Sequence, residues 1–174
     1  MNYAEIKTYD VANGPGIRVS LFVSGCTHKC KGCFNEEAWD FDYGEPFTDE
    51  VLQKLIDAAS FGAYRGLTFL GGEPLDPQNQ ADVLKTAKAF KEAYPDKDIW
   101  LFSGYTYEYI MKEMVGKLPE TEEILSLLDV LVDGPFIEEQ KNLMLLFRGS
   151  ENQRLINVPE TLKSGKIVEW EREI

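Results

Sequence analysis

The segment Cys26-Thr27-His28-Lys29-Cys30-Lys31-Gly32-Cys33 concentrates the chemistry of this chain, because it holds all three cysteines among the 174 residues. The C-x3-C-x2-C spacing lets three thiolates on one loop reach three corners of a cubane iron–sulfur cluster, whose irons ordinarily take cysteine sulfur as their ligand. The fourth iron is then left without a protein ligand. An open coordination position is where a metal centre binds a substrate or cofactor. The segment therefore predicts a reactive iron–sulfur cluster.

A zinc site, a disulfide framework and chance clustering are the alternatives to a cluster. A structural zinc site usually takes four ligands in two separated pairs, and the sequence has no second cysteine pair. His28, the only histidine, would have to act as the fourth ligand from between Cys26 and Cys30, which would strain so short a loop. A disulfide framework conflicts with the odd cysteine count and with the lack of a secretory signal. Chance clustering of structural cysteines is the remaining alternative, and we favour the cluster.

Length, composition and charge indicate an ordinary globular protein. The chain is 44% hydrophobic and 28% charged, and its length predicts one domain that buries about 70% of its unfolded surface without disulfides. With 18 basic and 30 acidic residues the net charge is −12, which is not the electrostatic footprint of a nucleic-acid binder. No apolar stretch approaches the ~18 residues of a membrane helix. We expect a cytoplasmic protein with neither a nucleic-acid nor a membrane partner.

Apolar runs alternate with amphipathic segments along the chain. Runs rich in β-branched and aromatic residues predict strands at 18–24, 66–70, 98–103, 129–133, 145–148 and 166–170. Helices are expected to begin after N-caps at Thr48, Asp76 and Thr106, with a further short helix at 124–128. This order implies right-handed βαβ units and a mainly parallel sheet.

Chemically distinctive residues follow the ends of the first four predicted strands. They are the cysteine segment, Gly71-Gly72-Glu73-Pro74, Ser103 and Asp133. The carboxyl ends of parallel strands share one edge of a sheet, which is where α/β folds place their chemistry. Two glycines at a strand end also let the backbone approach a ligand closely. Singly, each feature is more often an ordinary turn, but together they predict one site.

The combination of Cys26-x3-Cys30-x2-Cys33 with Gly71-Gly72-Glu73-Pro74 resembles the radical S-adenosylmethionine superfamily. Within it, the chain is similar to the anaerobic ribonucleoside-triphosphate reductase-activating proteins. The resemblance spans essentially the whole chain, through Asn13-Gly14-Pro15-Gly16, Cys33-Phe34-Asn35, Trp100-Leu101-Phe102-Ser103-Gly104-Tyr105, Val132-Asp133-Gly134-Pro135-Phe136 and Arg148-Gly149-Ser150-Glu151-Asn152-Gln153-Arg154. It implies an α/β fold, namely a partial, open (β/α) TIM-like barrel with a mainly parallel sheet, formed by a single radical S-adenosylmethionine domain over residues 1–174.

The resemblance also implies the roles of individual residues. Cys26, Cys30 and Cys33 would hold a [4Fe–4S] cluster whose remaining iron binds the amino and carboxylate groups of S-adenosylmethionine. The other residues expected to bind this cofactor are Gly32, Phe34, Gly71, Gly72, Glu73, Pro74, Ser103 and Asp133.

Among these, the backbone of Gly71 and Gly72, with Glu73 nearby, would accept hydrogen bonds from the methionine amino group. Asp133 would accept from the ribose hydroxyls, since a strand-end carboxylate suits a diol. The adenine contact stays open, because Gly32 stands where the superfamily commonly has an aromatic residue and Phe34 is the alternative aromatic face.

The implied reaction makes a radical on another protein. One electron from the reduced cluster would cleave S-adenosylmethionine to methionine and a 5′-deoxyadenosyl radical, which takes a hydrogen from a glycine of the partner reductase. The implied partners are therefore the glycyl-radical subunit of an anaerobic ribonucleoside-triphosphate reductase and a one-electron donor such as a flavodoxin. A short chain without further cysteines agrees with a protein loop as the substrate.

Two rival functions stay open. One is a small radical S-adenosylmethionine enzyme acting on a free metabolite, of the 7-deazaguanine synthase type, against which the run 148–154 argues. The other is a non-catalytic iron- or redox-sensing module, against which Gly71-Gly72-Glu73-Pro74 argues because a sensor needs no amino-acid site. Arg148 and Arg154 are candidates for holding a carboxylate or phosphate, with an ordinary surface position as the alternative.

Overall fold

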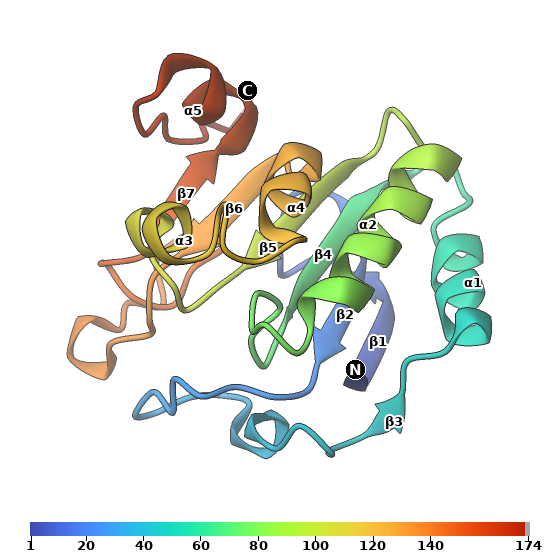
Figure 1. The fold of residues 1–174 in the computed structure, drawn as a ribbon, viewed down its shortest axis with the longest axis horizontal. Coiled ribbons are helices and arrows are strands. Elements are labelled where there is room, and N and C mark those ends of the chain that lie inside the picture. Colours follow the sequence, from blue (N-terminus) through green and yellow to red (C-terminus); the bar gives the residue numbers. More distant parts are fainter. Residues whose placement is uncertain (173–174) are drawn as a thin grey trace.

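The computed structural model describes residues 1–172 and contains one seven-stranded sheet with helices packed against it (Figure 1). The strands are β1 Asn2–Asp10, β2 Ile17–Val23, β3 Glu45–Pro46, β4 Tyr64–Gly71, β5 Asp98–Phe102, β6 Val130–Asp133 and β7 Arg154–Asn157. The α-helices are α1 Asp49–Ala58, α2 Gln80–Ala93, α3 Tyr107–Glu113, α4 Thr121–Leu127 and α5 Val158–Ser164. Two short 3₁₀ helices are η1 Glu36–Trp39 and η2 Glu138–Gln140.

The sheet is open and mixed, with its strands in the order β3-β1-β2-β4-β5-β6-β7. The central pairings β2–β4, β4–β5 and β5–β6 are parallel, whereas β3–β1, β1–β2 and β6–β7 are antiparallel. The end strands β3 and β7 do not pair with each other within residues 1–172. The α/β class and the parallel centre are thus confirmed, while the TIM-like curvature stays a prediction.

The two faces of the sheet are covered differently. Helices α1, α2, α3 and α4 lie over one face (Figure 1), where Leu55, Phe90, Ile110 and Ile124 join strand residues such as Leu21 in the main core. The opposite face carries a smaller cluster of Trp100, Val130, Val132 and Leu155, packed against Phe147 and Trp170 from the segments that follow β6 and α5. No helix in the described part of the chain has the length and apolar character needed to cross a membrane.

The strand predictions need correction at both ends of the chain. β1 and β3 were missed because their residues are mostly exposed or half-buried and show no apolar alternation. Residues 145–148 form no strand, since Phe147 adopts a left-handed φ of 57° that breaks an extended run. The strand expected at 166–170 is reduced to a bridge between Glu169 and Ile156, and the ordered elements of this region are β7 and α5.

The helix caps were predicted with mixed success. Thr48 and Thr106 are confirmed as N-caps, because their side chains accept hydrogen bonds from the backbone N–H groups of Val51 and Tyr109. Asp76 is wrong as the cap of α2, which begins later, at Gln80. The Asp76 side chain instead accepts from the backbone N–H of Gln78 at 2.9 Å, so that it forms an Asx turn before the helix.

A fully buried arginine, Arg18 at the start of β2, connects the central strands. Arg18 donates to Thr68 Oγ1 at 2.8 Å and to the Pro15 carbonyl at 3.0 Å, and it pairs with Asp98 at 2.5 Å. Its guanidinium lies 5.7 Å from the centre of the Trp100 ring. Burial lowers the pKa of Arg18, with the Asp98 carboxylate acting in the opposite direction. The side chain thereby joins β2, β4 and β5 to the turn that precedes β2.

Candidate iron–sulfur and cofactor site

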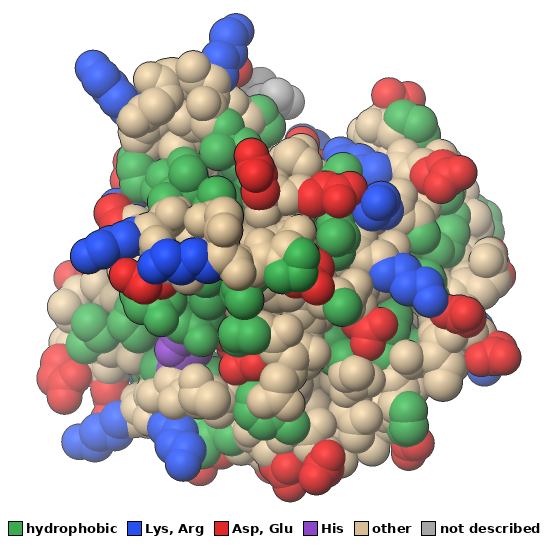
Figure 2. Space-filling model, viewed as in Figure 1, with side chains coloured by type: hydrophobic (Ala, Val, Ile, Leu, Met, Phe, Trp, Pro, Cys, Tyr) green, Lys and Arg blue, Asp and Glu red, His purple; other side chains and the backbone are tan. Residues whose placement is uncertain are grey.

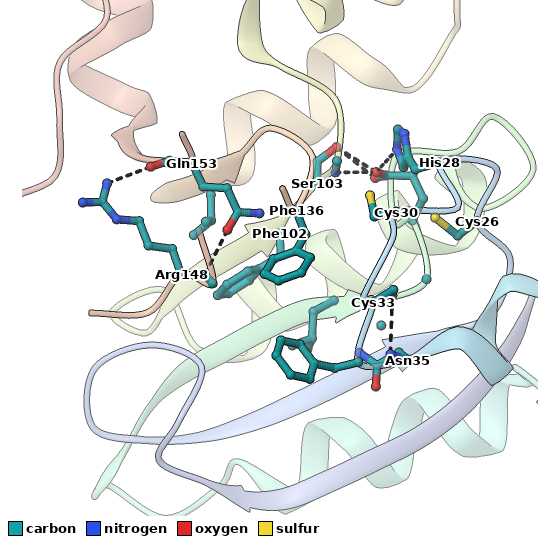
Figure 3. A pocket seen from close by; sticks show the side chains of 18 of the residues that line it. Cys26, His28, Cys30, Cys33, Asn35, Phe102, Ser103, Phe136, Arg148 and Gln153 are labelled. Atoms are coloured by element: carbon teal, nitrogen blue, oxygen red, sulfur yellow. Dashed lines mark hydrogen bonds and ion pairs between the residues drawn. The ribbon is translucent and has the colours of Figure 1, made fainter. Parts of the chain in front are cut away.

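A pocket of about 400 Å³ lies where the predicted site residues were expected to meet (Figure 3). Its lining comes from the loops that follow β2, β4, β5 and β6. The predicted residues in the lining are Cys26, Cys30, Cys33, Phe34, Gly71, Gly72, Glu73 and Ser103. Gly32, Pro74 and Asp133 do not line it. The shared edge of the parallel strands therefore brings most of the predicted residues together.

The three cysteines are free thiols of intermediate exposure. Burial raises the pKa of the Cys26 thiol to about 11, so this thiol is protonated at neutral pH and must release a proton when it binds a metal. The backbone N–H of Asn35 donates to Cys33 Sγ at 3.4 Å. Within residues 1–172, no three cysteine, histidine or carboxylate side chains converge closely enough to hold a single metal ion. Three thiols around one pocket are a donor set suited to an iron–sulfur cluster.

The start of the cysteine segment is fixed by backbone hydrogen bonds. The N–H of Gly25 donates to the Ala38 carbonyl at 2.7 Å, and the N–H of Cys26 donates to the Trp39 carbonyl at 3.1 Å. On the other side, the N–H of Glu73 donates to the Gly25 carbonyl at 2.8 Å. The chain leaving β2 is thus held between η1 and the turn that follows β4.

The two glycines of that turn are required by packing within the protein. Gly71 has a φ of 109°, which a side chain rarely permits. A Cβ on Gly72 would lie 2.6 Å from the Gly25 carbonyl oxygen and 3.0 Å from that of Ala38. The turn can therefore approach the cysteine segment only because position 72 has no side chain.

The Glu73 carboxylate is buried and fully engaged with donors from the protein. It accepts from the backbone N–H groups of Leu75 at 2.9 Å and Gly104 at 2.7 Å. The Ser103 hydroxyl lies 2.9 Å from Oε2, and His28 Nε2 lies 2.7 Å from Oε1 (Figure 3). The Glu73 carboxylate therefore binds groups of the protein itself. That the backbone of Gly71 and Gly72 contacts a methionine amino group stays a prediction.

His28 is placed by an aromatic neighbour as well as by Glu73. Its ring packs edge to face against Tyr105, with 4.4 Å between the ring centroids. Burial, together with the Glu73 and Asp76 carboxylates, raises the pKa of Tyr105 to about 12. The phenol therefore stays neutral where it contacts His28. The ring of His28 reaches the surface among hydrophobic side chains, as the purple group in Figure 2 shows.

Asp133 ends β6 as predicted but is paired with the protein. Its buried carboxylate accepts from the backbone N–H of Tyr107 at 2.8 Å and from Arg154 Nε at 3.0 Å. Arg154 also contacts Glu108 at 2.7 Å, and the hydrogen bonds that it donates to Asp133 and Glu108 raise the pKa of Arg154 further above its ordinary value. The arginine thus serves an internal ion pair, and a ribose contact by Asp133 would require that pair to open.

The pocket has an aromatic wall that sequence reasoning largely missed. Phe102, Phe136 and Phe147 line it together with Phe34, and the rings of Phe34 and Phe136 are 5.6 Å apart. Phe102 and Phe136 lie within stretches quoted for the family resemblance, so that likeness was the available signal. The wall gives the pocket a flat apolar surface of the kind that receives a planar heterocycle.

The run 148–154 is tied to the pocket by Gln153. Its Oε1 accepts from the backbone N–H of Gly149 at 2.9 Å, and its Nε2 donates to the Gly134 carbonyl at 3.1 Å. Arg148 donates to the Gln153 carbonyl at 2.7 Å, and these two residues lie across the pocket from Cys26 and His28 in Figure 3.

Two buried donors in the lining, Trp39 Nε1 and Arg148 Nε, have no hydrogen-bond partner within residues 1–172. An unsatisfied buried donor costs roughly 1–3 kcal/mol. Nothing in the sequence marks Trp39 as part of the site.

Comparison with known proteins agrees with the thiol site. The family described as a 4Fe-4S single cluster domain matches residues 12–156. A protein of Vibrio cholerae is 43% identical over 156 residues, which cover 88% of this chain and 96% of that protein. Proteins of Escherichia coli K12 and of phage T4 are 38% and 43% identical over 157 residues each, covering 88% and 89% of this chain and 96% and 93% of theirs. All three are named anaerobic ribonucleoside-triphosphate reductase-activating protein.

Proposed function

Since this chain belongs to the family of anaerobic ribonucleoside-triphosphate reductase-activating proteins, we propose that it is a radical S-adenosylmethionine activase. It binds a [4Fe–4S] cluster through Cys26, Cys30 and Cys33 and uses S-adenosylmethionine to generate a glycyl radical on an anaerobic ribonucleoside-triphosphate reductase. A one-electron donor such as a flavodoxin supplies the electron. Membership of the family supports the cluster domain and the activating role. The use of S-adenosylmethionine and the formation of a glycyl radical are what we propose.

One observation carries this proposal. Three free thiols, the backbone of the Gly71-Gly72 turn and an aromatic wall line a single pocket at the carboxyl edge of parallel strands. A sensor would need the thiols alone. A pocket beside them with an aromatic wall is suited to a cofactor that carries a heterocycle.

The protein's own groups orient and enclose the cofactor. When bound, the reduced cluster supplies one electron that cleaves the sulfonium bond of S-adenosylmethionine. Cys26, Cys30 and Cys33 would hold the cluster beside the pocket, and the adjoining Gly71-Gly72 turn would present main-chain groups to the methionine end of the cofactor. The phenylalanine wall, with Phe34 as its exposed member, receives the adenine and excludes water from that side of the pocket.

The mouth of the pocket suits a protein substrate. Leu145 and Phe147 line the pocket, and the loop that carries them exposes Leu143 by 85% and Met144 by 91%. The base of the loop is pinned, because the N–H of Asn142 donates to the Gly149 carbonyl at 3.2 Å. A segment of the reductase that reaches into the pocket must pass this apolar rim.

Anaerobic reconstitution with iron and sulfide tests the proposal. The full chain, reduced with dithionite and given S-adenosylmethionine, should form 5′-deoxyadenosine, and addition of the reductase should give a glycyl radical signal by electron paramagnetic resonance. Cys30→Ala should abolish cofactor cleavage and leave a folded protein, as judged by circular dichroism. Lys31→Ala changes an 84% exposed side chain of the same segment and should retain cleavage.

The outcomes separate the rival functions. Full cleavage by Cys30→Ala would refute the assignment of the cluster ligands. Cleavage without a glycyl radical on the reductase would favour the enzyme acting on a free metabolite. A cluster that binds but supports no cleavage would favour the sensor.

A further inference from the structure

His28 occupies an unusual place between two cluster-binding cysteines. Its side chain is 17% exposed, and its Nε2 contacts a Glu73 carboxylate that is 1% exposed. The cysteine segment belongs to the chain leaving β2, whereas Glu73 follows β4 and its other partners Ser103 and Gly104 follow β5. The His28–Glu73 contact is therefore a side-chain connection between the middle of the cysteine segment and two further strand ends.

The partners of Glu73 determine the direction of this hydrogen bond. Two of its donors are backbone N–H groups, of Leu75 and Gly104, and the third is the Ser103 hydroxyl. A carboxylate surrounded by donors acts as an acceptor. His28 Nε2 therefore donates to Oε1, in a charge-assisted bond of the stronger class.

The cysteine segment needs such an anchor, because its backbone is not in a relaxed conformation. Lys29, next to His28, has a φ of 51°, although it is not a glycine. A left-handed conformation is unfavourable at a residue with a side chain. Three neighbouring contacts hold the segment in this shape: the Glu73 hydrogen bond, the Tyr105 ring, and the close approach of Gly104, where a Cβ would lie 2.6 Å from the His28 ring.

We propose that His28 is a positioning residue for the cluster. Through Glu73 it fixes the cysteine segment against the ends of β4 and β5, so that the three thiols are held in the arrangement that receives the cluster. The inference rests on the proposed function only in requiring an iron–sulfur cluster at the three cysteines. Groups that orient metal ligands by hydrogen bonding typically contribute 10–100-fold to metal affinity.

Three variants of the full chain test this role. His28→Leu keeps an apolar side chain of similar reach but removes the donor. His28→Gln keeps an N–H donor that can reach Glu73. Lys31→Ala alters an exposed side chain of the same segment and is the matched control. Each is reconstituted anaerobically with iron and sulfide, while the apparent affinity for iron is followed by visible absorption and the reduced cluster by electron paramagnetic resonance.

We expect His28→Leu to lower the apparent affinity for iron by about 10-fold or more and to broaden the resonance of the reduced cluster. His28→Gln should restore most of the affinity and the wild-type line shape, and Lys31→Ala should match wild type. Thermal unfolding of the metal-free variants shows whether His28→Leu folds. If it does not fold, the comparison of His28→Gln with wild type decides, because a merely space-filling role predicts no rescue by the amide.

Two results would overturn the inference. One is wild-type affinity and line shape in a folded His28→Leu variant. The other is nitrogen coupling from His28 in the resonance of the reduced wild-type cluster, which would make His28 a ligand. Failure of the proposed function would be distinguished from failure of this inference by the wild-type protein. In that case wild type would not cleave S-adenosylmethionine, while the His28 variants would still differ from it in their affinity for iron.

Discussion

At the scale of the residue, Gly72 lies where the turn after β4 packs directly against the Gly25 and Ala38 carbonyls. The Gly71-Gly72 pair was predicted from its place at a strand end, and the structure places it there. Contacts with the Gly25 and Ala38 carbonyls also require glycine at position 72, while its close approach to a ligand stays a prediction. Asp133 shows the same limit. Its strand-end position was predicted, but its pairing with Arg154, twenty-one residues later, depends on the antiparallel return of β7 and cannot be seen in local sequence.

Gly72→Ala should therefore destabilise the protein. The added Cβ meets two backbone oxygens, which can move only if the cysteine segment or η1 shifts. Overpacking of this kind costs about 1–3 kcal/mol. Urea unfolding of the metal-free chain measures the loss in free energy of unfolding. Gly62→Ala is the matched control, because a Cβ there meets nothing within 4 Å, and a comparable loss in both variants would contradict the argument.

At the scale of the element, strands with a continuous apolar run and helices with one apolar face were predicted at the right places in the chain. β2, β4, β5 and β6 are buried strands of the parallel centre, and their apolar runs predicted them. β1 is mostly exposed or half-buried, and β3 has only two residues, so neither carries such a signal. The segment 145–148 is apolar because it lines a pocket and packs on Trp100, which local composition cannot distinguish from a strand.

The buried Arg18 gives a prediction at this scale, because it connects three strands. Arg18→Met keeps much of the side-chain volume but leaves Asp98 without its closest cation and the Pro15 carbonyl and Thr68 without a donor. Removing one partner of a buried pair costs about 3–5 kcal/mol, so we expect a loss of about 3 kcal/mol by urea unfolding.

Arg65→Met is the control for Arg18→Met. Arg65 also contacts Asp98, at 3.4 Å, but its side chain is 52% exposed. Exposed pairs contribute about 0–1 kcal/mol, so this variant should stay close to wild type. Equal losses in the two variants would show that Asp98, rather than the hydrogen bonds of Arg18, dominates.

At the scale of the whole molecule, the convergence of the site was predictable from topology. Parallel strands joined by helices bring their carboxyl ends to one edge, and this alone placed the cysteine segment, Gly71-Gly72-Glu73-Pro74 and Ser103 together. The loops after β6 were not predictable, because their shape depends on long-range contacts such as that between Gln153 and Gly134. They supply Phe136 and Phe147 of the aromatic wall and the exposed Leu143 and Met144.

The exposed rim yields a prediction about the partner. The double variant Leu143→Ser and Met144→Ser should lower the yield of glycyl radical on the reductase, because it removes apolar surface at the pocket mouth. Cleavage of S-adenosylmethionine in the absence of the reductase should be unchanged. Phe61→Ser removes a 75% exposed aromatic side chain that does not line the pocket and should alter neither. Unchanged radical yield in the double variant would exclude this loop from the contact.

The four groups that contact the Glu73 carboxylate also limit which substitutions this part of the chain can accept. Two of the groups that donate to this carboxylate are the main-chain amides of Leu75 and Gly104, and among single substitutions only a proline at either position would remove one of them. In Glu73→Gln, the side-chain NH₂ group would face these N–H donors. We therefore expect this substitution to be tolerated only if the surrounding loops change their conformation as well. Positions 28 and 103 are then expected to accept only side chains that can donate a hydrogen bond to Glu73.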